Sequence, residues 1–180
     1  LGQLDTAVAS YNQAITIKPD YFKAHSNLGD ALNDQGKLDE AVVSYNKAIA
    51  IKPDFAEAYS NLGITLQDLG RSDEAVASYN KAITIDPDFA DAHYNLGIVL
   101  QELRQFDTAV VSYNQAIAIK PDHAEAHCNL GNVLKELGQL DQAVVNYNNA
   151  LVIKPDFAEA YSNLGSTLQN LGKLNEAVAS

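Results

Sequence analysis

The residues best suited to chemistry are the histidines and the single cysteine near the middle of the chain. His123 and His127 are four residues apart, Cys128 follows directly, and His93 lies upstream. Two histidines one helical turn apart can share a zinc ion, so this group is a candidate metal site. The segment HAEAH nevertheless lacks the H-E-x-x-H order of zinc proteases. Phenylalanine and tyrosine fill the same positions elsewhere in a repeat described below. We therefore interpret His123 and His127 as polar substitutes for core aromatics and expect no metal or other cofactor.

Paired acids are the next candidates for chemistry. Asp39-Glu40 and Asp73-Glu74 recur at one interval, which suits the first turn of a helix, where negative charge meets the positive end of the dipole. They do not form an acid–base pair for catalysis. The chain also has no glycine-rich phosphate loop and no Ser, His and Asp arrangement beyond what the repeat copies throughout. We predict that it is not an enzyme.

A series of asparagines is the more informative pattern. They stand 34 residues apart, at Asn27, Asn61, Asn95, Asn129 and Asn163. Asparagine is a middling helix former, so an unbroken series on predicted helices needs a reason. Its amide offers donors and an acceptor that match the N–H and C=O groups of an extended peptide. One hypothesis is thus a ligand-binding ladder. The alternative is that these amides bond within or between neighbouring repeats.

Acidic residues share the asparagine face. Nine acids stand there against two lysines, namely Asp30, Asp34, Glu57, Asp68, Asp91, Glu102, Glu125, Glu136 and Glu159 against Lys23 and Lys135. This face is either a solvated surface or a groove whose field attracts a neutral or basic protein or peptide. The predicted ligand-binding residues are the five asparagines with Asp68, Glu102 and Tyr94. Tyr94 and Cys128 interrupt the serines that otherwise precede the asparagines, and so mark a candidate specificity position.

Composition excludes several classes of partner. Twelve basic and twenty-three acidic residues give a net charge of −11, which argues against nucleic acid and against an anionic membrane surface. No apolar run approaches the length of about 20 residues that spans a bilayer. The first ten residues lack the pattern of a signal peptide. One cysteine excludes an internal disulfide, which suits a reducing compartment, and we predict a cytoplasmic protein.

A 34-residue period determines the elements that hold these side chains. All five prolines keep it, at Pro19, Pro53, Pro87, Pro121 and Pro155. Two glycine series keep it as well, except that Arg104 replaces one member of the second series, and IKPDFAEAYSNLG occurs at both 51–63 and 153–165. Such regularity indicates a repeat architecture, and it has to be recognised before any other feature is interpreted.

Each repeat reads as two helices, as the unit 56–89 illustrates. Apolar residues at steps of three and four predict a first helix over 56–69, which Gly70 ends in the left-handed conformation. Asp73 is expected to cap a second helix that ends before Pro87. Small residues such as Gly63 and Ala75 allow the two helices to approach closely. Arg104, in a glycine position, would lose about 1–2 kcal/mol there, so we expect its turn to adopt another geometry.

The pattern resembles the tetratricopeptide repeat. In the unit 56–89 the matching residues are Tyr59, Leu62, Gly63, Leu66, Ala75, Tyr79, Ala82 and Pro87. The resemblance covers the whole chain, and it departs only in having His or Tyr rather than Trp in the first helix. It implies an all-α solenoid, a right-handed superhelix of antiparallel hairpins whose concave wall is formed by first helices. The asparagine series is also similar to that in the repeat region of O-linked N-acetylglucosamine transferases, and the chain as a whole is similar to bacterial members of the family.

The period also predicts the domain organisation. A second helix (1–21) precedes full repeats at 22–55, 56–89, 90–123 and 124–157, and 158–180 holds a first helix with a fragment of the next, all in one solenoid. The register leaves both ends uncapped, so the chain reads as a piece of a longer protein.

Three functions are compatible with this organisation. The leading hypothesis is a scaffold that binds a peptide or partner segment in an acidic, asparagine-lined groove. A carboxylate-binding groove is disfavoured, because no basic residue directly precedes the asparagines. The alternatives are the substrate-recruiting arm of a larger glycosyltransferase, and a superhelix that self-assembles through its uncapped ends.

Overall fold

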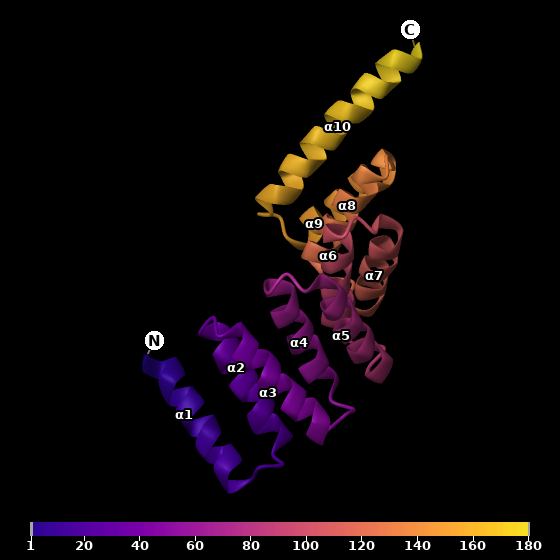
Figure 1. Ribbon diagram of the computed structural model, residues 1–180. Coiled ribbons are helices and arrows are strands. Elements are labelled where there is room, and N and C mark those ends of the chain that lie inside the picture. Colours follow the sequence, from indigo (N-terminus) through magenta and orange to yellow (C-terminus); the bar gives the residue numbers. More distant parts are fainter. Residues whose placement is uncertain (1, 180) are drawn as a thin grey trace. The chain divides into compact units, whose positions relative to one another are not determined.

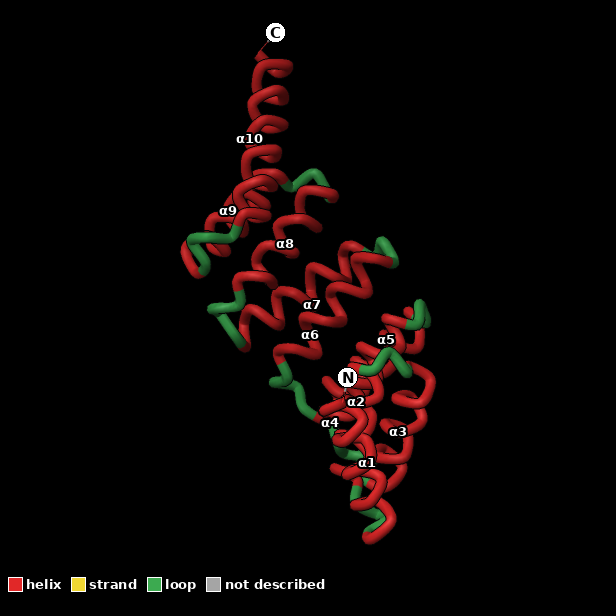
Figure 2. Tube along the Cα trace, turned by 90° about the vertical axis from the view of Figure 1, so that its left-hand side faces the viewer, coloured by secondary structure: helices red, strands yellow, loops and turns green. Residues whose placement is uncertain are grey.

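The computed structural model describes the backbone of residues 2–179 and the side chains through residue 172. Within that range the chain is entirely helical and its helices are joined by short turns (Figures 1 and 2). The helices are α1 (Gly2–Ile17), α2 (Phe22–Asp34), α3 (Leu38–Ile51), α4 (Ala56–Asp68), α5 (Ser72–Ile85), α6 (Ala90–Glu102), α7 (Phe106–Ile119), α8 (Ala124–Glu136), α9 (Leu140–Ile153) and α10 (Ala158–Ala179). The all-α class is as predicted.

The helices form two compact units, residues 1–92 and 93–180, with the boundary inside α6. In the first unit each helix from α1 to α4 packs against the next one in the chain. In the second unit α7, α8, α9 and α10 pack in the same consecutive way. Each unit is therefore a stack of antiparallel hairpins, as a solenoid requires. The prediction that one solenoid domain runs through the whole chain stays a prediction.

A tyrosine ring against a glycine sets the spacing of each hairpin. Tyr45, Tyr79, Tyr113 and Tyr147 are fully buried on the second helices, between two alanines of the same helix that are also buried. A Cβ atom added to Gly63 would lie 2.7 Å from Cε1 of Tyr79, and Gly29, Gly97 and Gly131 meet their tyrosines in the same way. Only a residue without a side chain fits under the ring, which confirms the predicted close approach of the two helices.

Glycine ends the first helices as predicted. Gly36, Gly70 and Gly138 have φ values of 73°, 72° and 75°, in the left-handed region. At Gly70 the backbone N–H donates to the carbonyl of Gln67, and the next N–H donates to Leu66, both at 2.8 Å. These bonds satisfy carbonyls that would otherwise lack partners at the end of the helix.

Arg104 does not adopt another geometry, so that expectation was wrong. Its φ is 57°, and its turn has the same two backbone bonds, to Gln101 at 2.9 Å and from Gln105 to Leu100 at 2.8 Å. The bonds and the packing of the following helix hold the turn despite the unfavourable contact of the arginine Cβ.

Two helix boundaries also differ from the sequence prediction. Helix α5 begins at Ser72 with Arg71 at the cap position, so Asp73 lies in the first turn and does not cap the helix. Its carboxylate can still interact favourably with the helix dipole. At the other end α10 continues without a break through Gly172, where a turn was expected. Helical hydrogen bonding satisfies the backbone there, and Gly172 lacks the positive φ that Gly70 has.

Candidate functional site

A polar cleft of the second unit is built mainly from its first helices. Its volume is about 570 Å³, within the usual range of ligand sites. The end of α6, the following turn and the first residue of α7 contribute one side, and α8 and α10 contribute the rest. The lining residues are Gln101, Glu102, Arg104, Phe106, Asn132, Lys135, Glu136, Glu159 and Asn163. Two predicted ligand residues, Glu102 and Asn163, are thus brought together.

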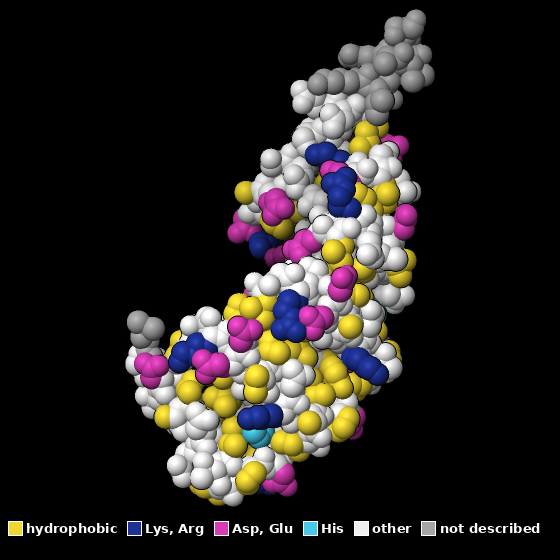
Figure 3. Space-filling model, viewed as in Figure 1, with side chains coloured by type: hydrophobic (Ala, Val, Ile, Leu, Met, Phe, Trp, Pro, Cys, Tyr) yellow, Lys and Arg dark blue, Asp and Glu magenta, His cyan; other side chains and the backbone are white. Residues whose placement is uncertain are grey.

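The cleft carries charges of both signs. Its three glutamates face two cations, Arg104 and Lys135, so the lining has a net charge of −1. The guanidinium of Arg104 lies 5.1 Å from the centre of the Phe106 ring, and Lys135 Nζ donates to Ser166 Oγ at 2.8 Å. Acidic and basic side chains are likewise intermixed on the face seen in Figure 3. The cleft is less acidic than the composition of the whole face predicts.

Asn163, the member of the asparagine series that lines the cleft, bonds to the preceding hairpin. Asn163 Nδ2 donates to Asn132 Oδ1 at 2.9 Å, and the hydroxyl of Tyr147 donates to the same oxygen at 2.9 Å. Burial raises the pKa of Tyr147 to about 12, so the phenol stays protonated and able to donate at neutral pH. A buried tyrosine and a groove asparagine thus share one acceptor.

The first unit repeats this arrangement. Asn61 Nδ2 donates to Asp30 Oδ1 at 2.9 Å, and the Tyr45 hydroxyl donates to the same oxygen at 2.8 Å. Burial, and then the Asp30 carboxylate, raise the pKa of Tyr45. A small pocket of about 130 Å³ adjoins these residues, and it is lined by Asp30, Asn33, Asp34, Tyr45, Asn61 and Ile64.

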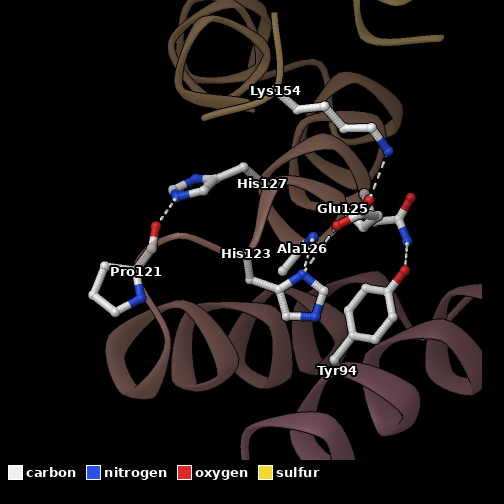
Figure 4. A network of polar contacts seen from close by, with 8 residues as sticks. Tyr94, Pro121, His123, Glu125, Ala126, His127 and Lys154 are labelled. Atoms are coloured by element: carbon white, nitrogen blue, oxygen red, sulfur yellow. Dashed lines mark hydrogen bonds and ion pairs between the residues drawn. The ribbon is translucent and has the colours of Figure 1, made fainter. Parts of the chain in front are cut away.

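Asn129 uses a different partner because isoleucine replaces the acceptor at position 98. Its Nδ2 donates to the hydroxyl of Tyr94 at 3.2 Å (Figure 4). The Tyr94 ring centre lies 4.5 Å from that of His123 and 6.0 Å from that of Tyr113. Burial raises the pKa of Tyr94. Tyr94, predicted from its break in the serine series, therefore belongs to an aromatic cluster that supports an asparagine.

A salt bridge borders this cluster. Lys154 Nζ lies 3.0 Å from Glu125 Oε1, and this hydrogen bond lowers the pKa of the Glu125 carboxyl (Figure 4). Nδ1 of His123 accepts from the backbone N–H of Ala126 at 3.3 Å, and Glu125 Oε2 lies 3.5 Å from the same nitrogen. His123 thus caps α8 and fixes the edge of the aromatic cluster.

Three asparagines therefore bond across hairpins, as the alternative hypothesis expects. An asparagine amide has two N–H donors and one carbonyl, and the cross-hairpin bond accounts for one of those donors. The other predicted residues are not among those that line the cleft: Asn27 and Asp68 are exposed on α2 and α4, and Asn95 is half-buried on α6. Ligand binding by these residues stays a prediction.

Cys128, which directly precedes Asn129, is too deeply buried to contact a ligand. Ser26, Ser60 and Cys128 are all buried. Burial raises the pKa of the Cys128 thiol to about 11. Our interpretation of Cys128 as a specificity position was wrong, because this side of a first helix faces the interior rather than the groove.

The histidines lie in the positions of core aromatics. His25 and His127 are buried, and their Nε2 atoms lie 2.9 Å and 3.3 Å from the carbonyls of Pro19 and Pro121, six residues earlier. Among the described side chains no group of three or more His, Cys, Asp or Glu could hold a metal ion. In the same part of the chain no helix is long and apolar enough to cross a membrane.

Sequence reasoning missed Gln101, Arg104, Phe106 and Asn132 as lining residues. A signal for Asn132 was present. It stands one helical turn after Asn129, in a series that reads Asp30, Ile64, Ile98, Asn132 and Ser166. Where that series is Asp or Asn, the asparagine of the next repeat bonds to it.

Stacked helical hairpins with a polar cleft on their first helices are typical of helical repeat scaffolds. Within that class the assignment is specific, since the family model described as TPR repeat matches residues 1–33, 29–70, 66–104, 102–138 and 131–172. The chain therefore belongs to the tetratricopeptide repeat family.

Solved structures of the family resemble the chain closely. A crystal structure of MamA is 28% identical, with a TM-score of 0.81 over 88% of this chain and 92% of that one. YrrB, described as a TPR protein with an unusual peptide-binding site, is 25% identical, with a TM-score of 0.79 over 90% and 84%. TTC0263, a thermophilic TPR protein of Thermus thermophilus, is 24% identical, with a TM-score of 0.69 over 94% and 92%, and shows the fold alone. No curated protein sequence matches the chain.

Proposed function

We propose that the chain is a protein-interaction scaffold that binds an extended peptide segment in the cleft of its second unit. The cleft is the observation that carries the proposal. Asn132, Asn163 and Gln101 bring amides to its wall, and amides match the alternating N–H and C=O groups of a peptide backbone. In this proposal the chain binds its partner and performs no chemistry on it. The peptide-binding site reported for YrrB, a structural neighbour, agrees with this role.

The charges of the cleft suggest the chemistry of the peptide. Glu102, Glu136 and Glu159 favour a lysine or arginine side chain, and Arg104 and Lys135 favour an acidic side chain or a backbone carbonyl. A peptide with neighbouring basic and neutral or acidic residues satisfies both sets. A purely acidic peptide does not, because the whole chain has a net charge of −11.

Selection from a peptide library tests this proposal. The complete chain would be immobilised, peptides selected from a displayed random library, and their affinities measured by fluorescence anisotropy. In the double variant Glu136→Gln and Glu159→Gln, we expect selected basic peptides to bind about tenfold more weakly, since two charge contacts of roughly 0.5–1 kcal/mol each are lost.

A matched control makes the same change of charge outside the cleft. Asp122→Asn and Asp141→Asn alter two exposed acids of the second unit that do not line the cleft. We expect this control to bind within about twofold of the unchanged chain, because neither side chain lines the cleft and salt screens exposed surface charges. Equal loss of affinity in both double variants would mean that only net charge matters. Failure to select any peptide would reject the proposal.

A further inference from the structure

A groove lies between the second helices α1 and α3 of the first unit, and the first helix α2 forms its floor. Its apolar lining is Val8 of α1, Leu28 and Leu32 of α2, and Val43 of α3, and we call it the valine groove. Its volume of about 280 Å³ is just below the usual range of small-molecule sites, so it suits the side chains of a docked segment. The asparagine series contributes nothing to its lining, so it is distinct from the surface predicted to bind a ligand.

Another groove of the same unit shows that this opening belongs to the repeat. It lies one period later, between α3 and α5 over α4, and its volume is about 230 Å³. Helices of the chain precede and follow it, so a groove of this kind stays open between neighbours on both sides. The equivalent repeat positions line it, namely Val42, Leu62, Leu66 and, in place of Val43, Ala77.

The exposed valine of the groove is not explained by the helix that carries it. Val43 is 53% exposed, and Val111 and Val145 at the same position of later repeats are 61% and 57% exposed. A β-branched side chain loses rotamer freedom in a helix, and an exposed one recovers little of that loss by packing. Alanine, the best helix former, occupies the same position as Ala77. An apolar contact from outside the chain would make use of the valine.

Two lysines distinguish the valine groove from its copies. Lys37 and Lys47 line it together with one acid, Glu40, so its lining has a net charge of +1 in a chain of net charge −11. Among the described side chains neither lysine takes part in an ion pair. In the next groove Arg71 donates two hydrogen bonds of 2.7 Å to the carboxylate of Glu74, which neutralises its charge. The valine groove therefore offers cations that a partner can pair with.

The spacing of the lysines defines the length of the partner. Lys37 and Lys47 stand ten residues apart with Val43 between them. At a rise of 1.5 Å per residue this is about 15 Å along α3. A helix that lies along the groove would match them with two carboxylates about ten residues apart, and with apolar side chains on the turns between.

We propose that the valine groove docks an acidic amphipathic helix of a partner protein, with a leucine-like side chain between Val8 and Val43 and a carboxylate beside each lysine. Helices dock in grooves of this kind through apolar side chains at helical spacing, and complementary charge fixes their register. The proposal is independent of the cleft, which belongs to the second unit and favours basic side chains.

Three labelled peptides of equal length test the proposal. The first carries glutamates near both ends, about ten residues apart, and leucines at helical spacing between them. The second has glutamine in place of each glutamate, and the third has serine in place of each leucine. Fluorescence anisotropy with the chain of residues 1–180 in about 0.15 M salt limits the long-range repulsion between the acidic peptide and the acidic chain. We expect the first peptide to bind about fivefold more tightly than the second and about tenfold more tightly than the third.

Substitutions in the groove separate charge from apolar contact. The double variant Lys37→Gln and Lys47→Gln should weaken the acidic peptide about fivefold and leave the glutamine peptide unchanged. Val43→Ser should weaken both peptides about fivefold, because both place a leucine against this side chain. All three positions lie at the surface of the groove, and circular dichroism would verify that the variants remain folded.

Val145→Ser is the matched control. Val145 occupies the same repeat position on α9 and is similarly exposed, but Gln139, Gln142 and Asn149 replace Lys37, Glu40 and Lys47 around it. We expect this variant to bind the acidic peptide within about twofold of the unchanged chain.

Several results would overturn the proposal. They are no binding of the acidic peptide at about 1 mM chain, an equal loss in Val145→Ser and Val43→Ser, or an equal loss of both peptides in the lysine variant. Loss of binding in Glu136→Gln and Glu159→Gln instead would assign the peptide to the cleft. Self-association of the chain that Val43→Ser abolishes would make the occupant a second copy.

Discussion

Gly63 and Gly165 end two identical copies of one segment, yet the structure surrounds them differently. At Gly63 an added Cβ atom would lie 2.7 Å from the buried ring of Tyr79, and at Gly165 it would lie in open space. Replacing each glycine by alanine therefore applies one chemical change to one local sequence in two environments. Any difference between the two variants reports the packing of the hairpin rather than helix propensity.

The magnitudes follow from two effects. Alanine favours a helix interior over glycine by roughly 0.5–1 kcal/mol, and this gain applies at both sites. Overpacking a filled interior costs about 1–3 kcal/mol, and this loss applies only at Gly63. Because Tyr79 is fully buried, its ring has little room to move away from the new methyl group. We expect Gly165→Ala to stabilise the chain slightly and Gly63→Ala to be the less stable by about 1–3 kcal/mol.

Urea unfolding at low protein concentration measures the difference. With a slope of about 2 kcal/mol per molar urea, the two midpoints should differ by roughly 0.5–1.5 M. Stacked hairpins can open separately, so amide hydrogen exchange in α4 and α5 should locate the loss of protection in Gly63→Ala.

A second substitution checks the cause. Tyr79→Leu removes the ring atoms that the new methyl group would meet, so the double variant should be less destabilised than the sum of the single variants. Additive effects, or a Gly63→Ala midpoint at or above that of Gly165→Ala, would refute the view that the glycine is required beneath the ring.

Four further predictions follow from the same structure. Arg104→Gly should raise the free energy of unfolding by about 1 kcal/mol in thermal melts, because the residue has a φ of 57°; an unchanged or lower stability would show that the arginine side chain compensates for its backbone. Cys128 should resist a thiol reagent at pH 8 until urea unfolds the chain, because its pKa is raised to about 11 and its side chain is buried; rapid labelling of the folded chain would contradict this burial. Raised phenol pKa values, to about 12 at Tyr147, imply stability that is complete below pH 10 and falls as pH rises toward 12, which alkaline unfolding followed by circular dichroism would detect. Asn61→Ala should cost about 0.5–1.5 kcal/mol in urea unfolding by removing the bond to Asp30, whereas a change within error would show that this bond adds no net stability.

The hairpins could be predicted because glycine and proline, whose backbone conformations are distinctive, mark the boundaries of the helices. The glycine at position 70 has the left-handed φ that its place in the repeat implies, and Asp86 is extended before Pro87. Buried Tyr79 and Ala75 follow from helical spacing, since their stripe is too apolar for solvent. Because the 34-residue period is constant, a correct assignment of the helices in one repeat applies to the other repeats as well.

The exceptions depend on interactions that a single repeat does not encode. Arg104 keeps a strained conformation because its turn has the same bonds as the glycine turns. Gly172 lies within a continuous helix, although its local sequence resembles that of Gly70. In both cases the surroundings of the residue outweigh its intrinsic preference.

The site was harder to predict than the fold. A helical wheel separates a polar stripe from an apolar one, but a first helix is buried over a wide arc, which places Ser60 and Cys128 in the interior. The partners of the asparagines also differ between repeats, from Asp30 to Tyr94 to Asn132. Because these partners lie about one repeat away, they cannot be found from the asparagine positions alone.

The tyrosine–glycine contact also affects whether such similar helices pair correctly during folding. Nearly the same helix occurs at α1 and α5, so α4 could in principle pair with either. Gly63 and Tyr79 are separated by only one turn and parts of two helices, and closing a short loop loses less chain entropy than closing a long one. Local pairing should therefore outpace mispairing, and the chain should fold rapidly despite its internal repetition.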